Sequence, residues 1–303
     1  MHQLTLGQLS TSALRGQLSK GMTLVTGPFR FRVQSDQASV VNGLATLYPD
    51  FPIEADAGFR DFHIRLDAVS GVRKWYRPQI NFWLDRHSPF KPLSKEHGFA
   101  LLEWGMNWCI AGYGHHYLLL HAAVLERNGQ CVILPGDPGA GKSTLTAALA
   151  LSGWRLLSDE LTIVDRDDGS LIPLARPISL KNHSIEVIRA FAPLAIFGEP
   201  AYDTHKGTVS HLRPPAASVA RMAEKGRGAH IVFPRWIAGS ATRLQPRSKA
   251  DAFMHAANHA FNYSLLGRRG FELNAHLVDT CACWDFEYSE LSEALDAFAQ
   301  LVA

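Results

Sequence analysis

The sequence predicts an α/β protein with an α+β region at its N-terminus. Three observations lead to this prediction. An apolar, strand-like run at residues 131–134 passes through a glycine-rich loop into a helix-forming stretch at residues 145–151. In the first third of the chain, residues 22–33 and 79–84 alternate in the way that antiparallel strands do. In the last third, helical patterns extend over residues 249–266, 269–279 and 290–302.

The N-terminal third carries strand and helix patterns but no catalytic motif. Residues 22–33 form a predicted hairpin, and Asp36 is expected to cap the helix that follows it. A further helix is expected over residues 94–112. We therefore expect residues 1–112 to form an α+β accessory domain and residues 113–303 to form the domain that carries the glycine-rich loop.

Composition and charge argue against several classes of protein. The chain has 303 residues, of which 47% are hydrophobic and 19% charged, and its net charge is +2 with histidines neutral. Such a small charge gives no electrostatic case for nucleic-acid binding. We expect no membrane partner and a cytoplasmic location, because no apolar run reaches the length of a membrane span and residues 1–5 lack a signal-peptide pattern. A homo-oligomer is compatible with this composition.

The most specific feature is the phosphate-binding pattern G-x-x-x-x-G-K-[ST], which directly follows the strand-like run. Its glycines let backbone N–H groups converge on an anion, and the next helix adds its positive N-terminal end. Lys142 is expected to reach the β- and γ-phosphates, and the Ser143 hydroxyl to bind Mg²⁺. The residues predicted to contact a nucleoside triphosphate are Gly136, Asp137, Pro138, Gly139, Ala140, Gly141, Lys142, Ser143 and Thr144. An ordinary strand-to-helix turn is the alternative.

Two adjacent carboxylates follow one helix later. Asp159 and Glu160 lie in a mostly apolar strand predicted over residues 154–164. Phosphate-loop enzymes often place a carboxylate at the end of a neighbouring strand, where it holds Mg²⁺ or positions the nucleophile. Strand alternation predicts that the two acids point to opposite faces and have different roles. A solvated strand end is the alternative.

Four further polar side chains are candidates for the site. His121 interrupts an apolar strand that pairs with the strand before the loop, so it is expected near the phosphates unless it is an ordinary core histidine. Lys206 and Arg213 lie in a polar, turn-rich segment, residues 198–215, which predicts a mobile lid that brings cations to the transferred group. A solvated loop is the alternative for that segment, and Lys181 either faces phosphate or is exposed.

With these residues together, the chain resembles the bacterial HPr kinase/phosphorylase superfamily, and within it the branch called HPr-kinase-related kinase A. In those kinases a histidine opens the strand before the phosphate loop, and a later strand carries Ala-Asp-Asp. His121 stands at the matching distance, residues 136–143 match the loop, and residues 157–160 match the acidic strand with glutamate as the second acid. The narrower match covers nearly the whole chain, including residues 103–109 and 176–182.

The resemblance implies a phosphate-loop kinase core with a mixed sheet, like that of HPr kinase and phosphoenolpyruvate carboxykinase. It implies Asp159 as the general base and His121 as its helper, with Lys206 and Arg213 stabilising the transferred charge. The implied cofactors are ATP and Mg²⁺, and the expected metal ligands are Ser143, Asp159 and Glu160. Members of the branch accompany a small PqqD-like protein, which favours a protein or peptide acceptor.

The prediction is therefore an HPr-kinase-like serine kinase, an ATP- and Mg²⁺-dependent phosphotransferase acting on a protein or peptide hydroxyl. Two alternatives stay open. One is a nucleotide-binding regulatory or scaffold protein that transfers no phosphate, and the acid and the histidine argue against it. The other is a kinase of a small metabolite, because the acceptor cannot be identified from these residues.

Overall fold

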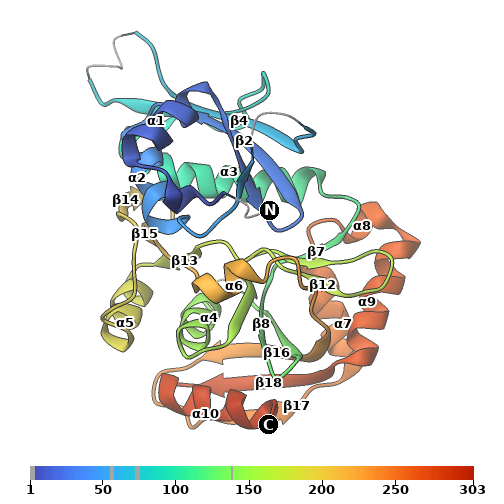
Figure 1. Ribbon diagram of the computed structural model, residues 1–303. Helices are drawn as coiled ribbons and strands as arrows, with labels where there is room; N and C mark the ends of the chain where they lie inside the picture. The colour runs from blue at the N-terminus through green and yellow to red at the C-terminus, as the bar shows by residue number, and fades with distance from the viewer. Residues whose placement is uncertain (1–3, 55–57, 72–75, 138) are drawn as a thin grey trace.

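The computed structural model describes residues 4–54, 58–71, 76–137 and 139–303. It is an α/β protein with two six-stranded sheets and two three-stranded sheets. Figure 1 shows the N-terminal sheet and its helices at the top and the remaining elements below them. Among the described residues, no helix combines the length and apolar character needed to cross a bilayer.

The N-terminal sheet has the strand order β3-β1-β2-β4-β5-β6. The predicted hairpin is confirmed, because β1 and β2 pair antiparallel from Met22–Val33 to Thr26–Phe29. The sheet is mostly antiparallel, as the sequence predicts, and only the pairing of β2 with β4 is parallel among the described strands. Its strands are β1 (Met22–Thr26), β2 (Phe29–Ser35), β3 (Ile53–Glu54), β4 (Phe62–Ala68), β5 (Gln79–Leu84) and β6 (Leu93–Ser94).

Three helices pack on this sheet: α1 (Thr11–Lys20), α2 (Ala38–Leu47) and α3 (Gly98–Tyr113). The N-cap of α2 is Gln37 and not Asp36. Helix α3 matches the helix expected over residues 94–112, although its first residues form the separate 3₁₀ turn Lys95–His97. The core around these helices also contains Leu161, Ile163 and Leu174 from the second half of the chain. The division of the chain at residue 112 stays a prediction.

The second large sheet has the order β10-β8-β9-β16-β18-β17. Strands β9, β16 and β18 run parallel, whereas β8, β10 and β17 pair antiparallel with their neighbours. The prediction of a mixed sheet is therefore confirmed. Its strands are β8 (Ala122–Arg127), β9 (Gln130–Pro135), β10 (Arg155–Ser158), β16 (Gly228–Trp236), β17 (Arg243–Pro246) and β18 (Ala282–Tyr288).

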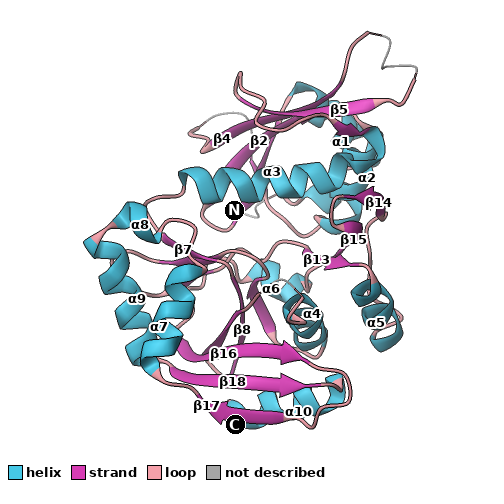
Figure 2. Cartoon of the chain, turned by 180° about the vertical axis from the view of Figure 1, so that it is seen from behind, coloured by secondary structure: helices cyan, strands magenta, loops and turns pink. Residues whose placement is uncertain are grey.

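Helices cover both faces of this sheet (Figure 2). Alternation along β8 explains the two layers, because Ala123 and Leu125 belong to one core cluster and Ala122 and Val124 to the other. The first cluster includes side chains of α4 (Lys142–Leu151) and α10 (Leu291–Leu301), and the second includes side chains of α7 (Lys249–Asn258) and α9 (Arg268–Thr280). The remaining helices are α5 (His183–Phe191), α6 (Ala216–Ala220) and α8 (Tyr263–Leu266).

The single strand predicted over residues 154–164 is wrong, because this segment is divided into β10 and β11, which lie in different sheets. Residues 198–215 were expected to form a loop but contain the hairpin β14–β15, and their role as a mobile lid stays a prediction. Residues 249–266 likewise form two helices, α7 and α8. The small sheets are β7 (Leu118–Leu120), β11 (Thr162–Val164) and β12 (Leu171–Ile172), and β13 (Ile178–Lys181), β14 (Ala201–Thr204) and β15 (Gly207–Leu212).

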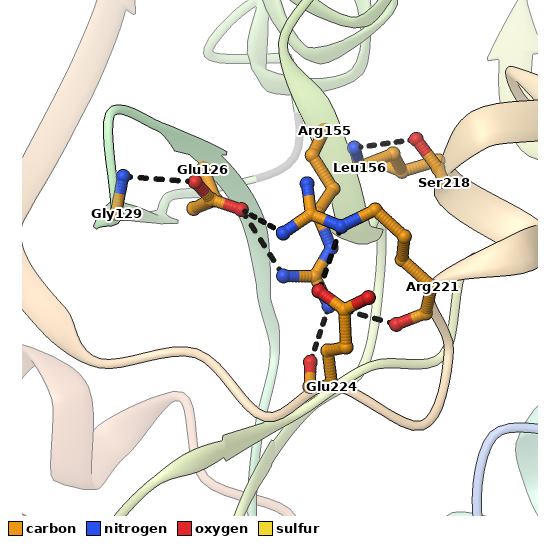
Figure 3. A network of polar contacts seen from close by, with 7 residues as sticks. All are labelled: Glu126, Gly129, Arg155, Leu156, Ser218, Arg221 and Glu224. Atoms are coloured by element: carbon orange, nitrogen blue, oxygen red, sulfur yellow. Dashed lines mark hydrogen bonds and ion pairs between the residues drawn. The ribbon is translucent and has the colours of Figure 1, made fainter.

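A buried ion pair holds β10 at the edge of its sheet (Figure 3). Arg155 Nη1 donates to Glu126 Oε2 on β8 over 3.1 Å, and both side chains are about nine-tenths buried, with 7% and 10% exposed. Arg155 Nη2 also donates to the carbonyl oxygen of Arg221, 2.9 Å away, and to that of Glu224. This network fixes the strand that leads into Asp159 and Glu160.

Replacing Arg155 by methionine should lower the free energy of unfolding by about 3 kcal/mol, because the buried charge of Glu126 would keep only its longer contact of 3.5 Å with the half-exposed Arg221. Urea unfolding followed by circular dichroism measures the change. The matched control is Arg268→Met, which removes an arginine that is 92% exposed in its pair with Glu272 and should leave the transition nearly unchanged. Equal transitions for both variants would contradict a stabilising role for the Arg155 network.

Candidate active site

The glycine-rich loop has the backbone shape that its sequence predicts. Gly139 and Gly141 have φ angles of 88° and 84°, in the left-handed region that favours glycine, and Gly141 is the N-cap of α4. Tyr288 Oη donates to the Gly141 carbonyl over 3.1 Å, and Trp236 N donates to the Ala140 carbonyl over 3.1 Å. The sheet therefore holds the loop from β16 and β18. Pro138 lies outside the described residues.

The predicted phosphate ligands lie at the start of α4. Ser143 and Thr144 are half-buried in its first turn. Lys142 is only 8% exposed, and its Nζ has no hydrogen-bond partner among the described residues. Burial lowers the pKa of Lys142, while the charges of Asp159 and Glu160 act in the opposite direction. A buried ammonium at a helix N-terminus beside flexible glycines fits the phosphates of a nucleotide.

The two acids lie outside the strands, on the turn between β10 and β11, so the prediction from strand alternation that they point to opposite faces does not hold for them. Ser158 makes the turn, because its hydroxyl donates to the Leu161 carbonyl over 2.6 Å and accepts from Leu161 N over 3.1 Å. Asp159 and Glu160 both line one small cavity, and both interact electrostatically with Lys142.

Asp159 is a buried carboxylate with an unusual pKa. It is 5% exposed, and its Oδ2 accepts a hydrogen bond from Ser179 N on β13 over 3.0 Å. Burial and the neighbouring charge of Glu160 raise its pKa to about 6, and Lys142 only partly offsets this. Asp159 also lines a cavity of about 20 Å³, large enough for one water molecule, with Ser179 and His211. A carboxylate with a pKa near neutrality suits a general base.

Glu160 is held by the N-terminal part of the chain. Its Oε2 accepts from Asn107 Nδ2 on α3 over 2.8 Å, and Asn107 Oδ1 accepts from Arg176 Nη1 over 2.8 Å. Arg176 in turn forms a buried ion pair of 2.6 Å with Glu103 on α3, whose Oε1 accepts from Tyr48 Oη over 2.5 Å. This chain of contacts connects the core of the N-terminal sheet to the candidate metal ligand.

Cations around Glu160 keep it ionised. Burial opposes ionisation, but Lys181, Lys206 and Lys142 outweigh it and lower the pKa of Glu160. Lys181 Nζ lies 3.6 Å from Glu160 Oε1. The structure therefore brings Lys181 to the acids, where an anionic ligand could also contact it.

His121 lies at the break between β7 and β8, not inside a strand as predicted. Its backbone N–H donates to the His259 carbonyl over 2.7 Å, and its ring lies 5.7 Å from that of Phe261. Burial, together with the positive charge of Lys142, lowers the pKa of His121 to about 4. The imidazole is therefore neutral at pH 7. Charges of the candidate site, those of Lys142, Glu160 and Lys181, act on it.

The two cations of residues 198–215 have different environments. Lys206, at the tip of the β14–β15 hairpin, interacts with Glu160, and its Nζ lies 5.9 Å from the Trp104 ring centroid. Arg213 does not join the acids of the candidate site, because it forms a 2.6 Å ion pair with Asp50 in the N-terminal part of the chain. A catalytic role for Arg213 would require that ion pair to open.

A large apolar cavity opens next to these residues. Its volume is about 730 Å³, and it lies between α3, the loop at residues 89–93 and the tip of the β14–β15 hairpin. Its lining includes the polar side chains of His121, Glu160 and Lys206. The side chains of its apolar wall are Phe90, Leu93, Leu101, Trp104, Trp108 and Phe261.

One loop residue has a partner that sequence reasoning missed. Asp137 Oδ1 lies 3.0 Å from His259 Nε2, while His259 Nδ1 contacts the His255 carbonyl over 2.9 Å. The ligand atoms of Asp137, His255 and His259 lie within 4.8 Å of one another, as in a metal site. The two imidazoles stack in parallel, and Arg247 Nη2 lies 3.5 Å from His255 Nδ1. A cation beside these rings favours a role in holding Asp137 of the loop in place over metal binding. The spacing of His255 and His259, one helical turn apart, was the signal available in the sequence.

Asn107 and Arg176 were part of the segments that carry the family resemblance, but no role was assigned to them. Their function depends on contacts across more than 50 residues of sequence, which periodicity does not reveal.

No protein-family model and no curated protein matches the chain. Among solved structures, the chain is similar to the HPr(Ser) kinase/phosphatase from Coxiella burnetii, with 12% sequence identity and a TM-score of 0.27, over 60% of this chain and 96% of that one. At this level of similarity, the chemistry has to be argued from the residues of this chain.

Replacing Gly141 by alanine should distort the loop, because the new Cβ would lie 2.6 Å from Tyr288 Oη and 2.9 Å from Trp236 Cβ. Gly139→Ala is the matched control: its φ is also positive, but its Cβ would meet nothing within 4 Å. For the control we expect only the cost of placing alanine in a left-handed conformation, which lowers the free energy of unfolding by about 1–2 kcal/mol. We expect Gly141→Ala to lose more stability and most nucleotide affinity, measured by thermal unfolding and calorimetry. A Gly141→Ala protein no worse than its control would contradict the tight packing of the loop.

Proposed function

We propose that this protein is an ATP-dependent kinase that transfers the γ-phosphate to a serine hydroxyl of a protein or peptide. The observation that carries the proposal is a buried Lys142, whose ammonium has no hydrogen-bond partner among the described residues, on a glycine-rich loop within electrostatic range of the raised-pKa carboxylate Asp159. The resemblance of the sequence to the HPr kinases supports the same reaction.

The donor side of the site would hold ATP. Backbone N–H groups of residues 139–144 and the ammonium of Lys142 would bind the β- and γ-phosphates. Ser143, Asp159 and Glu160 provide the hard oxygen ligands that Mg²⁺ prefers, and the ion would neutralise phosphate charge when bound. Lys181, close to Glu160, would add a further positive charge.

The transfer itself needs a base and cations. The acceptor oxygen attacks the γ-phosphorus, the bond from that phosphorus to the β–γ bridging oxygen breaks, and ADP leaves with the electron pair. Asp159 takes the proton of the acceptor hydroxyl, because its raised pKa makes it a stronger base than an ordinary aspartate. Neutral His121 would orient the hydroxyl, and Lys206 would stabilise the transferred charge.

The parts of the chain would divide these tasks. Residues 113–303 would form the kinase domain, and residues 1–112 an accessory domain that positions Glu160 through Asn107. A peptide acceptor delivered by a small PqqD-like protein follows from the family resemblance. A kinase of a small metabolite is the second candidate, favoured by the cavity of about 730 Å³, which is within the range of small-molecule sites.

Lys142→Ala should weaken Mg·ATP binding by about 10- to 100-fold, because it removes a charged hydrogen-bond donor from the phosphates. Isothermal titration calorimetry on the folded variant measures this loss. The control is Lys225→Ala, which removes a half-exposed lysine that pairs with Asp165 and Asp168 on the surface. Unchanged Mg·ATP affinity in a folded Lys142→Ala protein would show that the loop is not a nucleotide site.

Asp159→Asn should bind Mg·ATP nearly normally and transfer phosphate about 10²–10⁴-fold more slowly, because the amide cannot accept the proton. The wild-type rate should rise with pH and level off above about 6, since Asp159 acts only when deprotonated. The variant should lose that inflection. Release of ADP, with water or a serine peptide as acceptor, gives both profiles. A wild-type rate that is flat from pH 5 to 8, or an undiminished rate in the variant, would exclude Asp159 as the base.

A further inference from the structure

The large cavity beside the candidate site is lined by two chemically different groups of side chains. His121, Glu160 and Lys206 form the polar group, beside which the phosphate would be transferred. The rest of the wall is predominantly aromatic and aliphatic. An acceptor that places its hydroxyl at the polar group would therefore bring its neighbouring groups against apolar side chains.

Helix α3 supplies the central part of the apolar wall. Trp104 and Trp108 lie four residues apart, so they project from the same face of the helix. Both are only partly buried, although other residues of α3, such as Leu102 and Met106, are fully buried in the core. The Trp108 ring packs against Phe90 at 5.5 Å, which fixes its orientation.

Phe261 also lines the cavity, next to His121. It is 46% exposed, although it lies only three residues beyond the end of α7 and its backbone N–H donates to the Leu119 carbonyl over 2.8 Å. A half-exposed phenylalanine on a fixed backbone, 5.7 Å from a candidate catalytic ring, offers apolar surface that a ligand could cover.

We propose that this cavity binds the phosphate acceptor and selects an unfolded peptide segment that carries an aromatic or large aliphatic residue beside its serine. The proposal rests on the kinase function proposed above. It also gives the N-terminal part of the chain a second role, because α3 and residues 89–93 form one wall of the acceptor site.

The shape of the cavity favours a flexible segment over the surface of a folded protein. A volume of about 730 Å³ lined by α3 and the tip of the β14–β15 hairpin accommodates a few side chains and is open to solvent. An extended peptide can insert adjacent side chains into such a space, whereas the surface of a folded protein would contact only the rim of the cavity. Burying one phenyl or leucyl group there should strengthen binding by about tenfold or more.

The test uses nonapeptides with one central serine between two identical residues, on a glycine and asparagine background. The flanking residues are phenylalanine, leucine, alanine or glutamate. Quenching of tryptophan fluorescence in the presence of Mg²⁺ and a non-hydrolysable ATP analogue measures binding to the full-length protein. Mass spectrometry after incubation with Mg·ATP measures transfer. We expect the phenylalanine and leucine peptides to bind and react at least tenfold better than the alanine peptide, and the glutamate peptide to be the poorest.

Phe261→Ala should reduce the preference for phenylalanine over alanine by about tenfold. Phe271→Ala is the matched control, because Phe271 is 54% exposed on α9 and does not line the cavity. Trp108→Leu, which keeps an apolar side chain in contact with Phe90, provides a second variant with a smaller expected loss. Calorimetry should show unchanged Mg·ATP affinity in all three proteins.

The outcomes separate this proposal from the kinase assignment. Equal binding of the four peptides, or an equal loss in Phe261→Ala and Phe271→Ala, would overturn the acceptor site. Binding of N-acetyl-phenylalaninamide as tightly as the phenylalanine peptide would overturn it in favour of a small molecule. An aromatic preference in binding that depends on Phe261, without phosphate transfer to any peptide, would support the cavity as a peptide site and contradict the kinase function instead.

Discussion

The structure depends most on the buried ion pair between Arg176 and Glu103. Both side chains are more than nine-tenths buried, and their charges are satisfied by each other, by Tyr48 and by Asn107. A buried pair of this kind contributes little net stability compared with apolar packing, but it tolerates few alternative arrangements. It therefore fixes α3 against the segment before β13, and Asn107 extends the same network to Glu160.

The position of α3 determines both halves of the candidate site. On one side Asn107 orients an acid beside Lys142, and on the other Trp104 and Trp108 form the wall of the apolar cavity. The balance of charges follows from this arrangement. Three lysines hold Glu160 ionised, whereas burial raises the pKa of Asp159 to about 6. The two adjacent carboxylates therefore differ in the direction of their pKa shifts although they share one turn. The cause is that the balance between charge pairing and desolvation is different for each group.

Sequence reasoning succeeded where local interactions decide the structure. The first hairpin, α3 and the left-handed glycines at Gly139 and Gly141 agree with the sequence, because turn residues, apolar periodicity and the conformational freedom of glycine act within a few residues. It failed for residues 154–164 and 198–215. The first run is mostly apolar, but hydrogen bonds of Ser158 break it into two strands. The second is polar and rich in turn formers, yet pairing of β15 with β13 makes most of it part of a sheet.

The sequence by itself determined a glycine-rich loop between a strand and a helix and the chemical nature of its candidate partners, because those depend on residue types and short spacings. Only the tertiary structure decided which of the candidates meet. It brought His121, Lys181 and Lys206 to the acids, and it paired Arg213 with Asp50 instead. It also opened the apolar cavity between α3 and the hairpin at β14–β15. These contacts join segments distant in the chain, so they arise from packing and charge pairing that no local pattern encodes.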